Sequence, residues 1–371
     1  MQKSEIGQMD DEGQANPPIR IADFPQTTSG ELVMTVPPEL QHHNRQHSNG
    51  FPAASATAYA EDADNAGAIM PVPEKAFSTD ANIDVLDFAM QALEAGRKVA
   101  LCTLVEIRGG SSRSLGSHMA VADDGLYCGY VSGGCTEAAV AAEALEAMAK
   151  GHDRFVMLGE GSPFFDIQLP CGGGITIAVH LVRDMRPIQV AVGRLQARQH
   201  AGLSYSPSTQ CLSLRGAPGN VGWDGDAFLT AYRPNVRIFL SGRTLEVDTA
   251  AKIARAAGYE VIRHDPAAGA PEASLIDADT AIALLQHDLE LELPVLEAAL
   301  QAQPFYLGAL GSARTHEKRV ERLRTLGHSE QAIARIKAPI GLFGKARDAQ
   351  SLALSVIADI AVCRQAALEQ T

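Results

Sequence analysis

Residues 236–265 read Val-Arg-Ile-Phe-Leu-Ser-Gly-Arg-Thr-Leu-Glu-Val-Asp-Thr-Ala-Ala-Lys-Ile-Ala-Arg-Ala-Ala-Gly-Tyr-Glu-Val-Ile-Arg-His-Asp, and this stretch decides the fold. Residues 236–240 are predicted to form a strand. Residues 244–257 form a helical segment that stops at Gly258, and residues 259–263 form the next strand. A strand, a tight turn, a helix and a second strand of these lengths indicate a βαβ unit with parallel strands.

The same alternation continues to the end of the chain. The predicted elements are strands at residues 280–285 and 305–310 and helices that end near Ala302 or span 314–326 and 349–364. Strands and helices that alternate at this spacing predict an α/β fold. We therefore expect a Rossmann-like, doubly wound parallel sheet over residues 235–371.

The residues before this sheet predict a first domain of the α+β class at 79–186. Its expected elements are a helix ending at Gly96, strands at 98–107, 154–158 and 175–182, a hairpin at Asp124-Gly125 and a helix at 136–150. Residues 187–234 are predicted to be a connector with a short helix and a hairpin. Residues 1–78 have few apolar clusters, which predicts a disordered tail, because so little burial cannot offset the ordering entropy.

The composition disfavours several kinds of partner. Hydrophobic residues make up 46% and charged residues 20% of the chain, as in soluble globular proteins. The formal net charge of −13 disfavours nucleic acid and anionic lipid, and no apolar run is long enough to span a bilayer. The six cysteines have no disulfide or zinc-ligand spacing, which predicts reduced thiols and a cytoplasmic protein.

Glycines flank cysteines at two turns. Ser132-Gly133-Gly134-Cys135 follows a predicted strand and leads into a predicted helix, and Cys171-Gly172-Gly173 precedes a strand. Glycines let the backbone turn sharply, and a helix start favours an anion or a thiolate. These residues are therefore candidate contacts for an anionic ligand with an affinity for sulfur. The alternative for each cysteine is a small buried residue, as we expect for Cys102, Cys128 and Cys363.

The loop at residues 109–116, Gly-Gly-Ser-Ser-Arg-Ser-Leu-Gly, follows a predicted strand. Its backbone and hydroxyl donors, together with the planar guanidinium of Arg113, suit a phosphate. A flexible turn with a solvated Arg113 is the other interpretation. The loop is not a P-loop, because no Gly-Lys-Ser/Thr follows.

Two turns of the second domain are candidate nucleotide or anion sites. Gly242 lies where a dinucleotide fold has its glycine fingerprint, and Asp265 lies where an acid would bind a ribose hydroxyl. Leu240 and Leu245 replace the small residues of that fingerprint, which disfavours NAD(P). The turn at 308–315 is the better anion site because it combines glycines, a hydroxyl and an arginine at a helix start. Its candidate residues are Gly308, Gly311, Ser312 and Arg314.

Five segments, taken in order, resemble the XdhC/CoxI family of molybdoenzyme maturation factors from about residue 80 to 366. They are residues 109–116, 131–137, 170–173, 306–312 and 339–342. The resemblance implies a first domain peculiar to the family and a Rossmann-like second domain. It also implies a maturation factor rather than an enzyme: a chaperone that binds molybdenum cofactor, protects it during sulfuration and helps insert it into a xanthine dehydrogenase- or aldehyde oxidase-type molybdoenzyme.

The family resemblance also implies roles for particular residues and a set of partners. It makes Cys135 and Cys171 candidate contacts to sulfur or molybdenum, and Arg113 and Arg314 candidate contacts to the pterin phosphate or a nucleotide extension. Molybdopterin carries a phosphate and a soft, sulfur-bound metal, which suit helix starts and thiolates respectively. The expected partners are an apo-molybdoenzyme client, a cysteine desulfurase and a molybdopterin nucleotidyltransferase. A homodimer is one expected assembly.

Two other hypotheses remain open. The second domain suits an NAD(P)-dependent oxidoreductase, and Cys135 with Cys171 suits a redox or metal sensor. The histidines are scattered along the chain and no nucleophile can be paired with a base, so no catalytic residue is predicted.

Overall fold

The computed structural model describes residues 70–162, 172–216, 219–343 and 346–369. The predicted tail lies outside the described residues up to position 69, and so does Cys171. Residues 70–78, assigned to the tail by sequence, contain strand β1 (Glu74–Lys75), which pairs with β4 (Leu126–Gly129). The boundary predicted at residue 78 was therefore too late. The two residues of β1 are polar and exposed, so no apolar pattern marks them as a strand.

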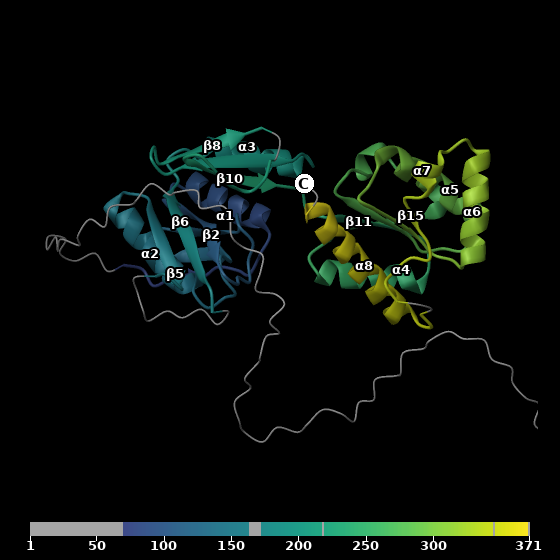
Figure 1. Cartoon of the computed structure of the whole chain (residues 1–371), viewed down its shortest axis with the longest axis horizontal. Helices are drawn as coiled ribbons and strands as arrows, with labels where there is room; N and C mark the ends of the chain where they lie inside the picture. The colour runs from purple at the N-terminus through teal and green to yellow at the C-terminus, as the bar shows by residue number, and fades with distance from the viewer. Residues whose placement is uncertain (1–69, 163–171, 217–218, 344–345, 370–371) are drawn as a thin grey trace, which may run out of the picture. The chain divides into compact units, whose positions relative to one another are not determined.

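The first domain is a sheet covered on both faces (Figure 1). Its other elements are α1 (Asn82–Glu94), β2 (Val99–Arg108), β3 (His118–Ala122), α2 (Glu137–Lys150), β5 (Arg154–Gly159), β6 (Gly174–Leu181) and α3 (Arg186–Gln196). The strand order is β1-β4-β3-β2-β6-β5. Apart from β1, every neighbouring pair is antiparallel.

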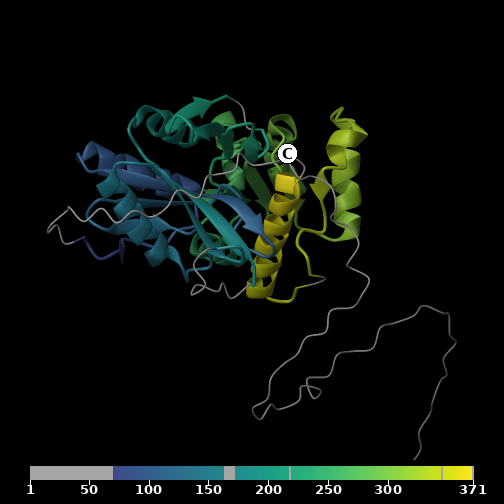
Figure 2. The same ribbon diagram turned by 60° about the vertical axis from the view of Figure 1, so that its left-hand side comes forward.

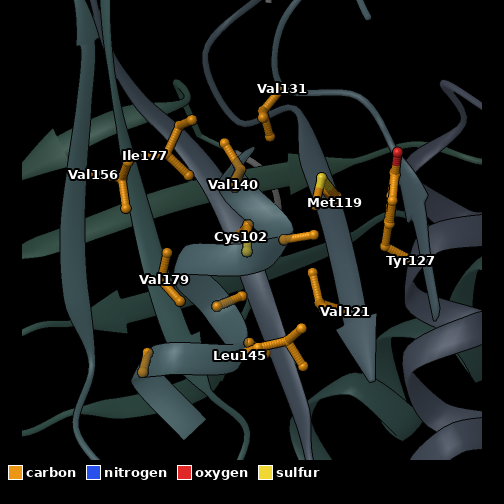
Figure 3. Packing of buried hydrophobic residues seen from close by; sticks show 14 of the residues in the cluster. Cys102, Met119, Val121, Tyr127, Val131, Val140, Leu145, Val156, Ile177 and Val179 are labelled. Atoms are coloured by element: carbon orange, nitrogen blue, oxygen red, sulfur yellow. The ribbon is translucent and has the colours of Figure 1, made fainter. Parts of the chain in front are cut away.

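Alternating side chains of β2 supply the cores on the two faces of this sheet. Ala100, Cys102 and Leu104 pack with the apolar stripe of α2, and this cluster includes Val140 and Leu145. Figure 3 shows Cys102, Val140 and Leu145 pointing into the space between α2 and the strands. Residues of the opposite face pack against α1 and α3. Burial on both faces explains why residues 99–105 are all apolar except Thr103.

The predicted connector is a small sheet. Strands β7 (Ala201–Ser206) and β8 (Cys211–Arg215) form the predicted hairpin, while β9 (Gly222–Asp224) and β10 (Ala227–Tyr232) form a second one that the sequence reading missed. The order β8-β7-β10-β9 is antiparallel throughout. The label "connector" was wrong because this sheet has a buried core around Phe228 and Tyr205.

The second domain confirms the doubly wound α/β prediction. Its elements are β11 (Arg237–Ser241), α4 (Leu245–Ala256), β12 (Glu260–His264), η3 (Pro266–Ala268), η4 (Ala273–Leu275), β13 (Thr280–Leu284), α5 (Leu289–Ala302), β14 (Tyr306–Ala309), α6 (Ala313–Thr325), α7 (Glu330–Ile333), β15 (Ile336–Lys337) and α8 (Ala349–Glu369). The five strands are parallel in the order β12-β11-β13-β14-β15. Helices α4 and α8 cover one face, and α5 and α6 cover the other (Figure 2). None of the helices within the described residues is long and apolar enough to cross a bilayer.

Candidate functional site

Three loops meet at one edge of the first sheet. Strands β2 and β4 are both antiparallel to β3, and β6 is antiparallel to β2, so the ends of β2 and β4 and the start of β6 share this edge. A Cβ atom on Gly173 would lie 2.4 Å from the carbonyl oxygen of Gly110, and one on Gly133 would lie 3.1 Å from Oγ of Ser112. The loop after β2 therefore contacts both glycine-rich turns singled out in the sequence.

A pocket of about 450 Å³ opens beside the loops that follow β2 and β4. Its lining residues come from β1, from the segment after β1 and from these two loops: Lys75, Ser78, Thr79, Asp80, Arg113, Tyr130, Gly133 and Gly134. The size is within the usual range for small-molecule sites. The pocket thus joins three residues predicted from the sequence, Arg113, Gly133 and Gly134, with others that were not predicted.

Two cations lie over the ring of Tyr130. The Nζ atom of Lys75 is 4.8 Å from the ring centroid, and the guanidinium carbon of Arg113 is 5.2 Å from it. Lys75 also donates to the phenol oxygen at 3.0 Å, and the phenol donates to Oγ of Ser78 at 3.1 Å. These bonds to Ser78 and Lys75 hold the pKa of Tyr130 below its usual value, and the bond to Tyr130 raises the pKa of Lys75. The pocket wall is an aromatic ring with two positive charges beside it.

Arg113 is held in place by Ser132 and Asp80. Its Nε donates to the carbonyl oxygen of Ser132 at 3.3 Å, and its Nη1 lies 3.0 Å from a carboxylate oxygen of Asp80. The interpretation of Arg113 as a merely solvated side chain is therefore wrong. The Asp80 carboxylate is exposed, so this ion pair is weak and an incoming anion can compete for the guanidinium.

The glycine turn after β4 is organised around a buried carboxylate. Glu137, the first residue of α2, is 1% exposed. It accepts from the Ser132 N–H at 2.9 Å, from Oγ of Ser132 at 2.9 and 3.0 Å and from the Thr136 N–H at 3.2 Å. The predicted anion site at this helix start is therefore already filled by the chain's own carboxylate. Sequence reading missed Glu137 because a glutamate in a first helical turn is ordinary.

Cys135 is exposed and follows directly after the pocket-lining Gly134. Helix α2 begins at Glu137 with Thr136 as its N-cap, so Cys135 precedes the helix and is not its first residue. The core reading of this cysteine is wrong, whereas Cys102 and Cys128 are buried as expected. Burial raises the pKa of each of these two thiols to about 12. Cys135 is thus a thiol at the rim of the pocket.

Around Cys171, the second glycine–cysteine turn is described only from Gly172 onward. Gly172 is exposed with φ of +69°, a conformation that favours glycine. Gly173 is buried against the backbone of Gly110 and Arg108, where no side chain fits. The requirement for glycine at 173 is accordingly structural, since it lets two chain segments pass closely.

In the candidate dinucleotide turn of the second domain, the acidic residue already has partners from the same domain. Asp265 accepts from Nε and Nη2 of Arg243 at 2.5 and 2.6 Å and from the Ala267 N–H at 3.0 Å. A Cβ atom on Gly242 would lie 2.7 Å from the carbonyl oxygen of Leu285. Glycine is therefore needed here for packing, and the acid expected to bind a ribose hydroxyl already has a cationic partner.

The turn between β14 and α6 carries the other predicted residues. Ser312 caps α6 by accepting from the Thr315 N–H at 3.3 Å, and Arg314 is exposed. Gly308 is buried where a Cβ atom would lie 2.6 Å from Ile340, and Gly311 has φ of +136°. These four residues lie in the second domain, and none of them lines the pocket of the first domain. No group of three or more His, Cys, Asp or Glu side chains within the described residues is arranged to hold a metal ion.

Lys75 and Tyr130 are the residues of the pocket that sequence reasoning missed. Lys75 lies in a stretch without an apolar pattern, so nothing in the sequence signals it. Tyr130 stands inside the glycine-rich motif, and an aromatic residue next to glycines and near an arginine was a usable signal.

The first domain has a sheet covered on both faces and a cationic, aromatic pocket, and the second domain is a doubly wound sheet. Together they define a two-domain α/β protein. Residues 92–159 match the XdhC and CoxI family, and residues 238–360 match the XdhC Rossmann domain. The chain is 50% identical over 294 residues to the molybdenum cofactor insertion chaperone PaoD of Escherichia coli K12, covering 79% of this chain and 92% of that protein. The chain therefore belongs to the XdhC and CoxI family, as the sequence motifs predicted.

Two more distant proteins are also similar. The uncharacterized protein YqeB of Escherichia coli K12 is 26% identical over 268 residues, which is 70% of this chain and 42% of that protein. A crystal structure of a chain described as a xanthine dehydrogenase from Bacillus halodurans superimposes with a TM-score of 0.60 at 19% identity. It covers 77% of this chain and 96% of that one. At this identity the likeness shows the fold alone.

Proposed function

We propose that this protein is a chaperone that binds molybdenum cofactor as cargo, protects it and assists its insertion into a molybdoenzyme of the xanthine dehydrogenase or aldehyde oxidase type. The observation that carries the proposal is the pocket in which Lys75 and Arg113 lie over the ring of Tyr130 beside Gly133 and Gly134. The 50% identity to a molybdenum cofactor insertion chaperone supports it independently.

The chemistry of the pocket suits each part of this cargo. Lys75 and Arg113 provide two charges for the phosphate, and a phosphate that displaces the exposed Asp80 carboxylate can contact the guanidinium of Arg113. The face of Tyr130 provides a platform on which a flat pterin ring can stack. The backbone at Gly133 and Gly134 lets a ligand approach closely because no side chain stands in the way.

Cys135 is placed to contact the molybdenum end of the cofactor. Its thiol is exposed at the end of the glycine turn, and a thiolate is a suitable contact for molybdenum or for its sulfur ligands. We assign Cys135 this role because the turn that carries it is fixed by Glu137. Sulfuration of the cargo would bring in a cysteine desulfurase, and delivery would require an apo-molybdoenzyme client.

Occupancy of the purified protein tests this function. The chain is expressed in a host that makes molybdenum cofactor, purified without oxygen and analysed for molybdenum by mass spectrometry and for pterin by fluorescence after oxidation. The proposal predicts both in equal amounts, approaching one per chain. Wild-type protein with neither, after anaerobic handling, would overturn it.

A further inference from the structure

Three buried polar atoms near the carboxyl ends of β13 and β14 have no hydrogen-bond partner within the described residues. They are Nε2 of Gln286, Nδ1 of His316 and Nη1 of Arg319. Gln286 is 7% exposed and Arg319 is 1% exposed. An unsatisfied buried donor costs about 1–3 kcal/mol, so unpartnered atoms on neighbouring elements point to an acceptor that the described residues do not supply.

The fold brings these atoms to the same edge of the second sheet. Leu284 of β13 pairs with Ala309 of β14, and the Leu310 N–H donates to the Leu284 carbonyl at 2.9 Å. Gln286 follows β13 by two residues. Arg319 reaches back from α6 and donates through Nη2 to the Leu310 carbonyl at 2.9 Å. Its guanidinium therefore lies beneath the turn that follows β14.

His316 lies one helical turn before Arg319 on the same side of α6. Residues three apart on a helix are neighbours, and the nearby charge of Arg319 adds to burial in lowering the pKa of His316. The imidazole is neutral, so its Nδ1 carries a proton in one of the two tautomers. It can then serve as a third donor beside the guanidinium.

The charges around this cluster leave room for one more anion. Glu292 of α5 pairs with Nε and Nη2 of Arg319 and is 1% exposed, and burial raises the pKa of this carboxyl. Asp288, the N-cap residue of α5, accepts from the N–H groups of Glu290 and Leu291. Nη1 of Arg319 and the start of α6, which is capped only by the neutral Ser312, remain as positive groups at this edge.

We infer that the carboxyl edge of β13 and β14 binds a phosphate group, with Gln286, His316 and Arg319 as its donors. The chemical class is a phosphate carried by a nucleotide or free phosphate. Ligands of doubly wound sheets bind outside the carboxyl ends of the strands, which is where these donors lie. The atoms are enclosed in this conformation, so a phosphate reaches them only if the turn around Gly311 shifts outward. The inference goes beyond the proposed function, because it concerns the other domain and none of the pocket residues.

Isothermal titration calorimetry on the full chain tests this site with ADP, CDP, GDP, UDP, NADH and inorganic phosphate as separate probes. We expect saturable binding of at least one of these. Binding weakened about tenfold by Gln286→Leu and by His316→Leu is the expected result, which corresponds to the loss of one hydrogen bond each. Gln301→Leu, at the exposed end of α5, is the matched control and should bind as wild type.

The probes distinguish the source of the phosphate. A nucleotide that binds at least about tenfold tighter than inorganic phosphate assigns the site to nucleotides, and equal affinities assign it to phosphate itself. Flat titrations with every probe, or binding unchanged in both folded variants, would overturn the inference. The titrations are repeated on Lys75→Met/Arg113→Gln protein, which lacks the two charges of the first-domain pocket. The dependence on Gln286 and His316 should persist there, so this outcome is independent of the molybdenum occupancy.

Discussion

Ser132 and Glu137 form a closed unit in which the backbone N–H and the hydroxyl of Ser132 both donate to the buried carboxylate of Glu137. The carboxylate fixes the turn that carries Gly133, Gly134 and Cys135. An anion supplied by the chain itself therefore shapes the wall of the pocket, while Lys75 and Arg113 remain available to an anion from outside.

Removing this carboxylate should destabilise the first domain. Glu137→Ala leaves two buried N–H groups and a hydroxyl without an acceptor, so we expect the free energy of unfolding to fall by about 2–4 kcal/mol. Urea denaturation followed by circular dichroism measures this. The control is Glu146→Ala on the same helix, whose ion pairs are partly exposed, and it should cost under about 1 kcal/mol. Equal losses in the two variants would contradict the assigned role of Glu137.

Stability should fall with acid because of His118. This imidazole is 3% exposed, bonded to Thr103 and Tyr232, and burial lowers its pKa to about 3. Between the ordinary pKa of about 6.5 and pH 3 the unfolded chain binds a proton here that the folded chain does not. The free energy of unfolding therefore falls by about 1.4 kcal/mol per pH unit below 6.5 from this group alone, and the effect is absent above that pH.

Urea unfolding at pH 7 and pH 5 isolates this contribution. The loss between the two pH values should be about 2 kcal/mol smaller in His118→Gln than in wild type. His152→Gln, an exposed histidine of the same domain, should lose as much as wild type. An unchanged pH dependence in His118→Gln would show that this histidine is protonated in the folded chain.

Two glycines that flank α4 allow the cost of backbone strain to be measured separately from the cost of a steric collision. Gly258 has φ of +82° and open space around it, so Gly258→Ala should cost only the left-handed strain of about 1 kcal/mol. Gly242→Ala adds a contact at 2.7 Å with the Leu285 carbonyl and should cost about 2–4 kcal/mol. Thermal and urea denaturation of both variants checks the order. If Gly242→Ala lost less stability than Gly258→Ala, the turn at Gly242 would relax around the added methyl group without cost.

Thiol labelling should report cargo at Cys135. Cys135 and Cys211 are both exposed, whereas Cys102 and Cys128 are buried with raised pKa values. With iodoacetamide and peptide mass spectrometry, the two exposed thiols should react at least about tenfold faster than the buried ones. Bound cofactor should slow Cys135 and leave Cys211 unchanged. If the cofactor protects both cysteines equally, or protects neither, Cys135 does not belong to the proposed site.

Much of the fold was predictable because apolar periodicity marks every long element. Residues 236–240 and 259–263 predicted β11 and β12 to within a residue, because β-branched and other apolar residues between helix and turn signals mark a strand. Strands β1, β9, β10 and β15 were not predicted. Strands β1, β9 and β15 have only two or three residues, which are too few to show a periodic signal.

The site was predictable only in part. Glycines and Arg113 are recognisable from local chemistry, and the motifs identified the family. The closeness of Arg113 to Ser132 depends on how β2, β3 and β4 pair, which no local pattern encodes. Lys75 is brought in by β1, and the pairing of Asp265 with Arg243 is a side-chain choice that spacing alone does not reveal.

Cofactor occupancy of a pocket variant tests the central claim most directly. Lys75→Met/Arg113→Gln removes both charges beside Tyr130, and Lys252→Met/Arg255→Gln removes the same two charges from the exposed side of α4. Each is expressed in a cofactor-producing host, purified anaerobically and assayed for molybdenum and pterin. The account predicts at least about tenfold lower occupancy in the first variant, as expected for losing two charge-assisted contacts, and wild-type occupancy in the second. Full occupancy of a folded Lys75→Met/Arg113→Gln protein would contradict it.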